Sequence, residues 1–420
     1  MRGSGRFRAS ACLGTGLLAI SLLAGAATPD QGSAQAALSS GRALRQAGSY
    51  REAIAELKKG LNVAGLSPAA RVAISWEIAR SYIDDHKFNE AVAACRAVGK
   101  IAEGKGPSHA CLGEAHMMRS RATEALPEAE LALQDAPGLY EAKVVKGRAL
   151  GQSGSVTEAE RVLRDAINDS PNRVDAYCWL GELFVVQGKR DAAIEQLEKA
   201  RTLEPKDASL AFSLGRLLAP AQAVRVLGSA VTLRPGFVAA WARLAEAWLA
   251  AGKLSEAESA AQQTLKLDDR QVDARAVLAR LHFLAKRYDD ALKEARAVLE
   301  AASSHASAKL TEADALAAKG EIDPAIDAYQ SAHSLARTDP TVLVSAARAC
   351  LGGGRETSAK SFADRAVETF PKWAPGWVVL GDILAKGREN AKAKQAYRTA
   401  LGAEGPIDRQ EVERRLAALK

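Results

Sequence analysis

One short stretch of the 420-residue chain gathers side chains that could bind a soft metal ion. His109, Cys111, His116, Met117 and Met118 lie within ten residues of one another. Imidazole, thiol and thioether groups together suit Cu(I). On one helix, however, the two histidines would face the core while the two methionines face the opposite side, so the five side chains cannot converge on one ion. We therefore predict that they pack in the core, and we expect no metal.

A glycine-rich segment, residues 99–106, resembles a phosphate-binding loop in its spacing. It lacks the Ser or Thr after Lys105 that would hold magnesium, and no strand precedes it. The segment is instead typical of a flexible connection between helices. The chain has no Cys-x-x-Cys or His-Glu-x-x-His motif. We find no catalytic constellation, and we expect neither enzyme activity nor a cofactor.

An internal repeat decides which elements carry these residues. Pro137, Pro171 and Pro205 are spaced 34 residues apart. Residues 174–207 contain the fullest version of the pattern between such prolines. Its apolar and small positions are Tyr177, Leu180, Gly181, Phe184, Gly188, Ala193, Leu197 and Ala200. This period and this pattern resemble the tetratricopeptide repeat, a helix–turn–helix unit of 34 residues.

The resemblance extends from about residue 34 to the end of the chain, and it implies an all-α fold. The expected architecture is a right-handed α-solenoid of tandem helix–turn–helix repeats. We count about eleven units over residues 34–406, followed by a solvating helix over 407–420. The predicted units begin near Ser33, Val72, Gly106, Tyr140, Val174, Ala208, Val238, Val272, Ala306, Pro340 and Ala374. The sixth unit is four residues short, and Pro220 should begin its second helix.

The first 27 residues are typical of a secretory signal. Three arginines make a positive start, and residues 11–27 form an uncharged run that ends near an Ala-Gly-Ala cleavage sequence. A second candidate cleavage sequence lies at residues 34–36, and residues 28–33 form a short linker. We expect export to the periplasm or cell envelope. The alternative is an uncleaved N-terminal segment that anchors the protein in the membrane.

Four cysteines follow the signal segment, which is too few for a disulfide framework. Cys95 and Cys111 fall on neighbouring helices, and export would allow them to form a bridge. We favour the interpretation that both are small buried apolar residues.

Charges alternate along one face of the predicted solenoid. From the second unit onward, the residue after the Leu-Gly position changes sign at every step. These ten residues, the charge ladder, are Arg80, Glu114, Arg148, Glu182, Arg216, Glu246, Arg280, Asp314, Arg348 and Asp382. First helices of adjacent units are neighbours in a solenoid, so each Arg should lie between two carboxylates. We interpret the ladder as a structural network on the concave side, since interleaved charges leave no net field to steer a partner. The alternative is a groove that offers charges to a ligand.

Apolar residues of the same helices predict a partner-binding groove in units three to six. They lie just before the Leu-Gly position or one turn beyond it. The predicted groove residues are Met117, Met118, Val144, Val145, Cys178, Trp179, Val185, Val186 and Phe212. Binding energy concentrates at apolar patches with an aromatic anchor, which here is Trp179. The alternative is that some of these side chains pack against neighbouring helices.

The resemblance implies a non-catalytic protein–protein interaction scaffold whose concave groove holds a partner. We expect an apolar or amphipathic segment of a protein or peptide as that partner. The net charge of +7 is spread along the chain without a basic block, which argues against nucleic-acid binding. No small-molecule substrate is expected, and membrane contact is expected only if the signal segment stays uncleaved. The alternative function is a regulatory or stabilising subunit of an envelope enzyme, secretion or polysaccharide-export complex.

Overall fold

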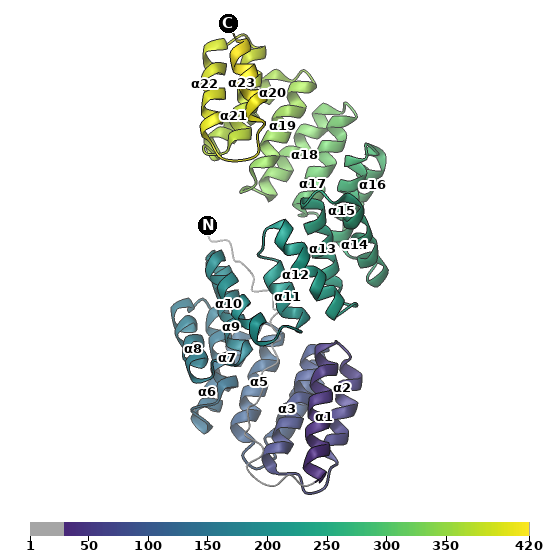
Figure 1. The fold of residues 1–420 in the computed structure, drawn as a ribbon, viewed down its shortest axis with the longest axis vertical. Helices are drawn as coiled ribbons and strands as arrows, with labels where there is room; N and C mark the ends of the chain where they lie inside the picture. The colour runs from purple at the N-terminus through teal and green to yellow at the C-terminus, as the bar shows by residue number, and fades with distance from the viewer. Residues whose placement is uncertain (1–28, 420) are drawn as a thin grey trace. The chain divides into compact units, whose positions relative to one another are not determined.

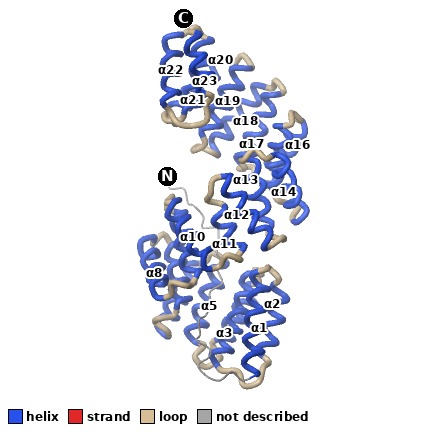
Figure 2. Tube along the Cα trace, in the orientation of Figure 1, coloured by secondary structure: helices blue, strands red, loops and turns tan. Residues whose placement is uncertain are grey.

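The computed structural model describes residues 29–419, which form 23 α-helices joined by short turns (Figures 1 and 2). The first 22 of these helices form eleven antiparallel pairs. The first helices are α1 (Pro29–Gln46), α3 (Pro68–Asp84), α5 (Lys105–Met118), α7 (Tyr140–Gln152), α9 (Val174–Val186), α11 (Ala208–Gly215), α13 (Val238–Ala250), α15 (Val272–Leu284), α17 (Ala306–Ala318), α19 (Pro340–Gly352) and α21 (Ala374–Lys386). The second helices are α2 (Tyr50–Leu61), α4 (Phe88–Val98), α6 (Ala122–Asp135), α8 (Val156–Asp169), α10 (Arg190–Leu203), α12 (Pro220–Leu233), α14 (Leu254–Leu267), α16 (Tyr288–Ala301), α18 (Ile322–Leu335), α20 (Glu356–Thr369) and α22 (Asn390–Gly402).

The helices divide into two compact units, whose boundary lies inside α13 between Leu244 and Ala245. Unit 1 contains α1 to α12 and the first part of α13. Unit 2 contains the rest of α13 and the helices that follow. Each unit is an all-α solenoid of the predicted class. In the part of the chain that the structure describes, no helix is both long enough and apolar enough to span a bilayer. The predicted signal segment lies outside the described residues.

The 34-residue period locates the helix starts. Eight first helices, from α7 to α21, begin at the residue predicted for their unit. The first three begin one to four residues earlier than predicted. Pro68 explains one of these differences: it occupies the first turn of α3, and the Ser67 side chain accepts a 3.2 Å hydrogen bond from the Ala70 N–H. Part of the predicted linker, from Pro29 to residue 33, is helical and belongs to α1, which corrects that boundary.

Small residues let the two helices of a pair approach closely. A Cβ atom on Gly181 of α9 would lie only 3.0 Å from Cγ of Leu197 on α10. Gly147 and Leu163 have the same relationship in the preceding pair. Leu163 and Leu197 are fully buried, so glycine makes the space that these leucines fill.

Aromatic side chains form hydrogen bonds to the turns between successive helix pairs. The indole Nε1 of Trp241 donates to the carbonyl of Pro235, and Trp377 does the same to Pro371, both at 2.8 Å. The Tyr177 hydroxyl donates to the carbonyl of Pro171 at 3.1 Å. Each donor lies six residues after its proline. The repeated prolines therefore mark turns whose carbonyl groups are satisfied by the next first helix.

Two predictions about the sixth helix pair are confirmed. Helix α11 has only 8 residues, and α12 begins at Pro220. The last helix, α23 (Arg409–Ala418), covers the C-terminal end of unit 2. Val412 is 2% exposed in the core there, and Leu416 and Leu419 pack against it.

Candidate partner-binding site

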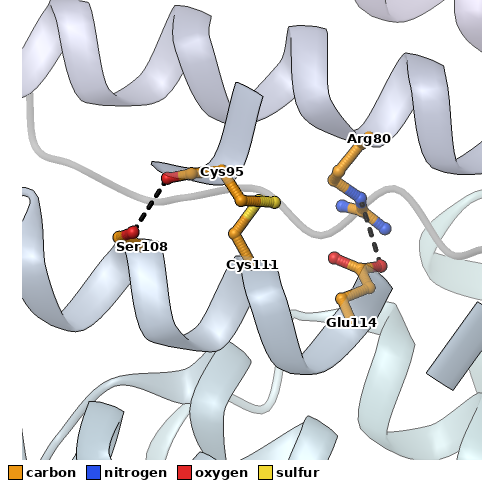
Figure 3. Close-up of a disulfide and its surroundings, with 5 residues drawn as sticks. All are labelled: Arg80, Cys95, Ser108, Cys111 and Glu114. Carbon is orange, nitrogen blue, oxygen red and sulfur yellow. Dashed lines mark hydrogen bonds and ion pairs between the residues drawn. A yellow bond between two sulfur atoms is a disulfide. The ribbon is translucent and has the colours of Figure 1, made fainter. Parts of the chain in front are cut away.

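Ladder residues of unit 1 form ion pairs between successive first helices. Nε of Arg80 lies 3.6 Å from a carboxylate oxygen of Glu114 (Figure 3), and Arg216 lies 3.7 Å from Glu182. Arg80 and Glu114 are buried. Burial by itself lowers the pKa of Arg80, but the carboxylates of Glu114 and Asp175 raise that pKa above its usual value. The alternating signs therefore neutralise charge inside unit 1.

The next arginine of the ladder, Arg148, contacts an aromatic ring. Its guanidinium lies 3.8 Å from the centre of the Trp179 ring, a cation–π contact. Burial lowers the pKa of Arg148 to about 10, while the nearby carboxylate of Glu114 opposes this change. The side chain is still a cation at neutral pH, and it covers one face of Trp179.

Sequence reasoning missed a second set of buried charges in unit 1. Arg45, which is 2% exposed, donates to Glu77 at 3.2 Å and to Asp84 at 2.6 Å. Glu77 and Asp84 lie three residues before and four residues after Arg80, so helical spacing could have placed them on the ladder face. Arg80 also lies 3.4 Å from Asp175, which is 95 residues away. The 34-residue pattern contains no signal for that contact.

The first and the sixth helix pairs of unit 1 meet. Nε and Nη2 of Arg234, at the end of α12, donate to the carbonyl of Gln46 at the end of α1, at 3.2 and 2.7 Å.

Three carboxyl groups, those of Glu204, Asp175 and Asp207, lie close enough to interact inside unit 1. Burial, together with Asp175 and Asp207, raises the pKa of Glu204 to about 8. The inner side of unit 1 is therefore occupied largely by its own charged groups.

In unit 2, ladder aspartates bind tyrosines as well as arginines. Asp314 pairs with Arg280 and accepts a 2.7 Å hydrogen bond from the Tyr329 hydroxyl. Asp382 accepts a 2.7 Å bond from a tyrosine hydroxyl on α22 and two 2.8 Å bonds from Arg415 on α23. Arg348, between these two aspartates in the ladder, is exposed.

Most predicted groove residues are packed inside unit 1. The buried ones are Met117, Val144, Val145, Cys178, Trp179 and Phe212. Met118 and Val185 are half-buried, and only Val186 is well exposed, at 47%. These side chains therefore form no open apolar surface, because neighbours cover them: the Phe237 ring lies 5.0 Å from that of Phe212, and Arg148 covers Trp179. Their role in partner binding stays a prediction.

A more open groove lies on the first-helix face of unit 2. It is a pocket of about 410 Å³ formed by α13, α15 and α17. Its floor includes the buried residue Val277 and the half-buried residues Leu249 and Leu310. Glu246 and Asp273 are the acidic residues among its walls. We call this site the unit 2 groove. A pocket of this size, with an apolar floor and a few charges, suits a small number of inserted side chains.

The histidines and methionines of α5 do not converge. Nδ1 of His109 lies 2.7 Å from Glu128, whereas His116 packs edge-on against Phe88. Met117 is 4% exposed and packs in an apolar core cluster. Among residues 29–419, no group of His, Cys, Asp or Glu has the arrangement of a metal site.

Cys95 and Cys111 form a disulfide, contrary to the interpretation that both are simply small core residues (Figure 3). Their Cα atoms are 5.4 Å apart on α4 and α5, a separation that a disulfide spans readily. The Ser108 hydroxyl donates to the carbonyl of Cys95 at 2.8 Å. Close packing of consecutive helices from two successive helix pairs of unit 1 therefore brings the two thiols together.

Comparisons with known proteins agree with this architecture. Models described as tetratricopeptide repeats match residues 219–281 in one case, and residues 144–208, 180–222 and 277–341 in another. No curated protein matches the sequence.

Solved structures with a similar arrangement include the Cut9–Hcn1 hetero-tetramer of APC/C, at 14% identity and a TM-score of 0.55. That match covers 84% of this chain and 76% of the other. Yeast Tom70 matches at 12% identity and a TM-score of 0.47, covering 92% and 95% of the two chains. PilF of Pseudomonas aeruginosa matches at 15% identity and 0.44, covering 49% of this chain and 96% of its own. At such identities the likeness concerns the fold alone. The family models show tetratricopeptide repeats within residues 144–341, and the same paired helices continue on both sides of that range.

Proposed function

We propose that this protein is a non-catalytic scaffold that binds a segment of another protein in the unit 2 groove. Repeat solenoids present extended surfaces formed by equivalent helices, and such surfaces bind extended partners. The observation that carries the proposal is the groove across α13, α15 and α17, with its apolar floor and its charged walls.

The unit 2 groove is a better candidate than the apolar residues predicted in unit 1. Leu249 and Leu310 are half-buried and lie beside open space, whereas Trp179 and Phe212 are each 7% exposed. An incoming apolar side chain gains free energy only where it removes exposed surface from water. The groove offers such surface on three successive first helices.

We also propose that the scaffold works in the periplasm or cell envelope. The support is the sequence of residues 1–27, with its positive start, uncharged run and small-residue cleavage sequence. An oxidising compartment also favours the disulfide between Cys95 and Cys111.

Site-specific photo-crosslinking in intact cells tests the binding site. A photoreactive amino acid replaces Leu249 or Leu310 in the groove, or Leu131 as the control. Leu131 is 42% exposed on α6 in unit 1. We expect both groove positions to crosslink to the same partner peptide, identified by mass spectrometry, while position 131 does not. Equal crosslinking at all three positions, or none in the groove, would refute the proposal.

A further inference from the structure

A pocket on unit 1 lies beside the irregular sixth helix pair, and we call it the sixth-pair pocket. It has a volume of about 590 Å³ and is lined by residues of α10, α11 and α12 and of the segment that joins α11 to α12. Its apolar lining includes the half-buried residues Ile194 and Leu218. The carbonyl of Leu217, next to Leu218, accepts a 2.7 Å hydrogen bond from Arg190 at the start of α10. The segment that follows the short helix α11 is therefore held in place, and the pocket offers apolar surface to a partner.

The shortening of the sixth pair changes which side chains line this pocket. A pocket of about 640 Å³ occupies the equivalent place in unit 2, between the tenth and eleventh pairs. There Asp364 of α20 corresponds to Glu198 of α10 in its position along the helix. The lining beyond α21 consists of Gly387 and Glu389, in the turn before α22. In unit 1 this turn is shortened, and α12 itself contributes side chains to the pocket, including that of Arg225. The deletion therefore brings a guanidinium group to the pocket.

Two guanidinium groups reach the sixth-pair pocket without an ion pair to any carboxylate of residues 29–419. Nη2 of Arg201 on α10 donates to the Ser229 hydroxyl at 3.4 Å. Arg225 is exposed and has no hydrogen-bond or ion-pair partner in the described part of the chain. Among the lining residues, all of which the structure describes, Glu198 carries the one carboxylate. Two positive groups and one negative group therefore leave the lining with a net charge of +1.

The equivalent pocket of unit 2 has the opposite balance. Four carboxylates line it together with two cationic groups; these residues are Glu356, Asp364, Glu368, Glu389, Lys360 and Arg365. An excess of arginine is therefore a property of the sixth pair rather than of every groove between successive pairs.

We propose that the sixth-pair pocket is a second docking site, which binds an acidic amphipathic segment of a partner protein. A carboxylate of that segment pairs with Arg225 and Arg201, because guanidinium groups donate strong charge-assisted hydrogen bonds to carboxylates. A neighbouring apolar side chain of the segment covers Ile194 and Leu218 and removes their exposed surface from water. This apolar lining favours a protein segment over a small hydrated anion. The site lies on unit 1, so the inference goes beyond the binding proposed for the unit 2 groove.

Two synthetic peptides of matched length and leucine content, one with glutamates and one with glutamines, test this inference. Each carries a fluorophore, and anisotropy measures its binding to the purified full chain. We expect the glutamate peptide to bind more tightly, with an affinity that falls as the salt concentration rises. Arg225→Gln should weaken its binding about fivefold. Glu198→Gln should strengthen it, because the substitution removes a like charge from the pocket. Arg365→Gln, in the equivalent pocket of unit 2, is the matched control and should leave the affinity unchanged.

Circular dichroism and thermal melting establish that each variant is folded. Equal binding of the two peptides, no detectable binding of the glutamate peptide, or an equal loss in Arg225→Gln and Arg365→Gln would overturn the inference. Displacement of the labelled peptide by inorganic phosphate as readily as by unlabelled peptide would also overturn it, because it would show a site for small anions. The proposed function is tested at Leu249 and Leu310 in unit 2, so either proposal can fail while the other stands.

Discussion

Tyr329 donates a 2.7 Å hydrogen bond to Oδ1 of Asp314, from fifteen residues farther along the chain. Tyr397 and Asp382 repeat this relationship with the same distance and the same spacing. The residues fifteen positions after the ladder glutamates are Ala129, Leu197 and Ala261. Aspartate is one methylene shorter than glutamate, so a tyrosine from the second helix can reach it. In these two repeats a tyrosine of the second helix therefore holds the ladder carboxylate together with an arginine, which is Arg280 for Asp314 and Arg415 for Asp382.

Tyr329→Phe should lower the free energy of unfolding of unit 2 by about 1–3 kcal/mol, because Oδ1 of the buried Asp314 loses its donor. Tyr397→Phe should cost less, since Oδ1 of Asp382 still accepts a bond from Arg415. Urea unfolding followed by circular dichroism measures both changes. An equal loss in the two variants would contradict this account of the aspartates.

Glu204 should make unit 1 less stable as the pH rises. Its pKa is raised from 4.5 to about 8 by burial and by two nearby carboxylates. Between these values the folded state keeps a proton that the unfolded chain releases, so this contribution to stability is lost as the pH rises from about 4.5 through about 8. Glu204→Gln should flatten the melting temperature over that range. A wild type that declines no more steeply than the variant would exclude Glu204 as the cause.

Trp179→Ala should destabilise unit 1 by about 3 kcal/mol, because the indole is 7% exposed and one face lies under Arg148. Leu131→Ala, at an exposed position, should change stability by no more than about 0.5 kcal/mol. Thermal unfolding of both variants provides the comparison. An unchanged melting temperature together with a loss of partner binding would instead indicate that Trp179 contacts the partner in the predicted groove.

Removing the disulfide should destabilise unit 1 as well. Cys95 and Cys111 are 16 residues apart, and a loop of that length corresponds to about 3 kcal/mol. Dithiothreitol should therefore lower the melting temperature of the wild type but not that of a Cys95→Ala, Cys111→Ala variant. Cys350, which is a buried free cysteine, supplies the control. Cys350→Ala should retain the full response to dithiothreitol; a lost response would place the redox sensitivity elsewhere.

The exported protein should begin at Ala27 rather than at Ala37. Cleavage before Ala37 would remove Ala34, which is 4% exposed and packs in the same core cluster as Leu57. Expression of the full chain in a bacterial host, with fractionation and mass spectrometry of the N-terminal peptide, measures this directly. Intact protein that begins at Met1 in the cytoplasm would contradict export.

Local features of the fold could be predicted because a 34-residue period repeats them. Gly181 opposite Leu197, and the start of α12 at Pro220, follow from residues that are close in sequence. The burial of Trp179 and the contact of Arg80 with Asp175 depend on how the array curves over several repeats. Small rotations between repeats add up to that curvature, and no single sequence position encodes it. The ion pairs of Arg80 with Glu114 and of Arg216 with Glu182 therefore follow the period of the sequence, whereas the burial of Trp179 is visible only in the folded array.

The hydrogen bonds from Arg234 to the Gln46 carbonyl join residues that are 188 positions apart. They make unit 1 differ from a linear array of repeats. In a linear array each repeat interacts with its neighbours only, so the ends fray independently and stability accumulates one repeat at a time. A contact between the first and the sixth pair makes each end a neighbour of the other. Unit 1 then gains cooperativity that a linear array lacks, and its higher contact order slows folding.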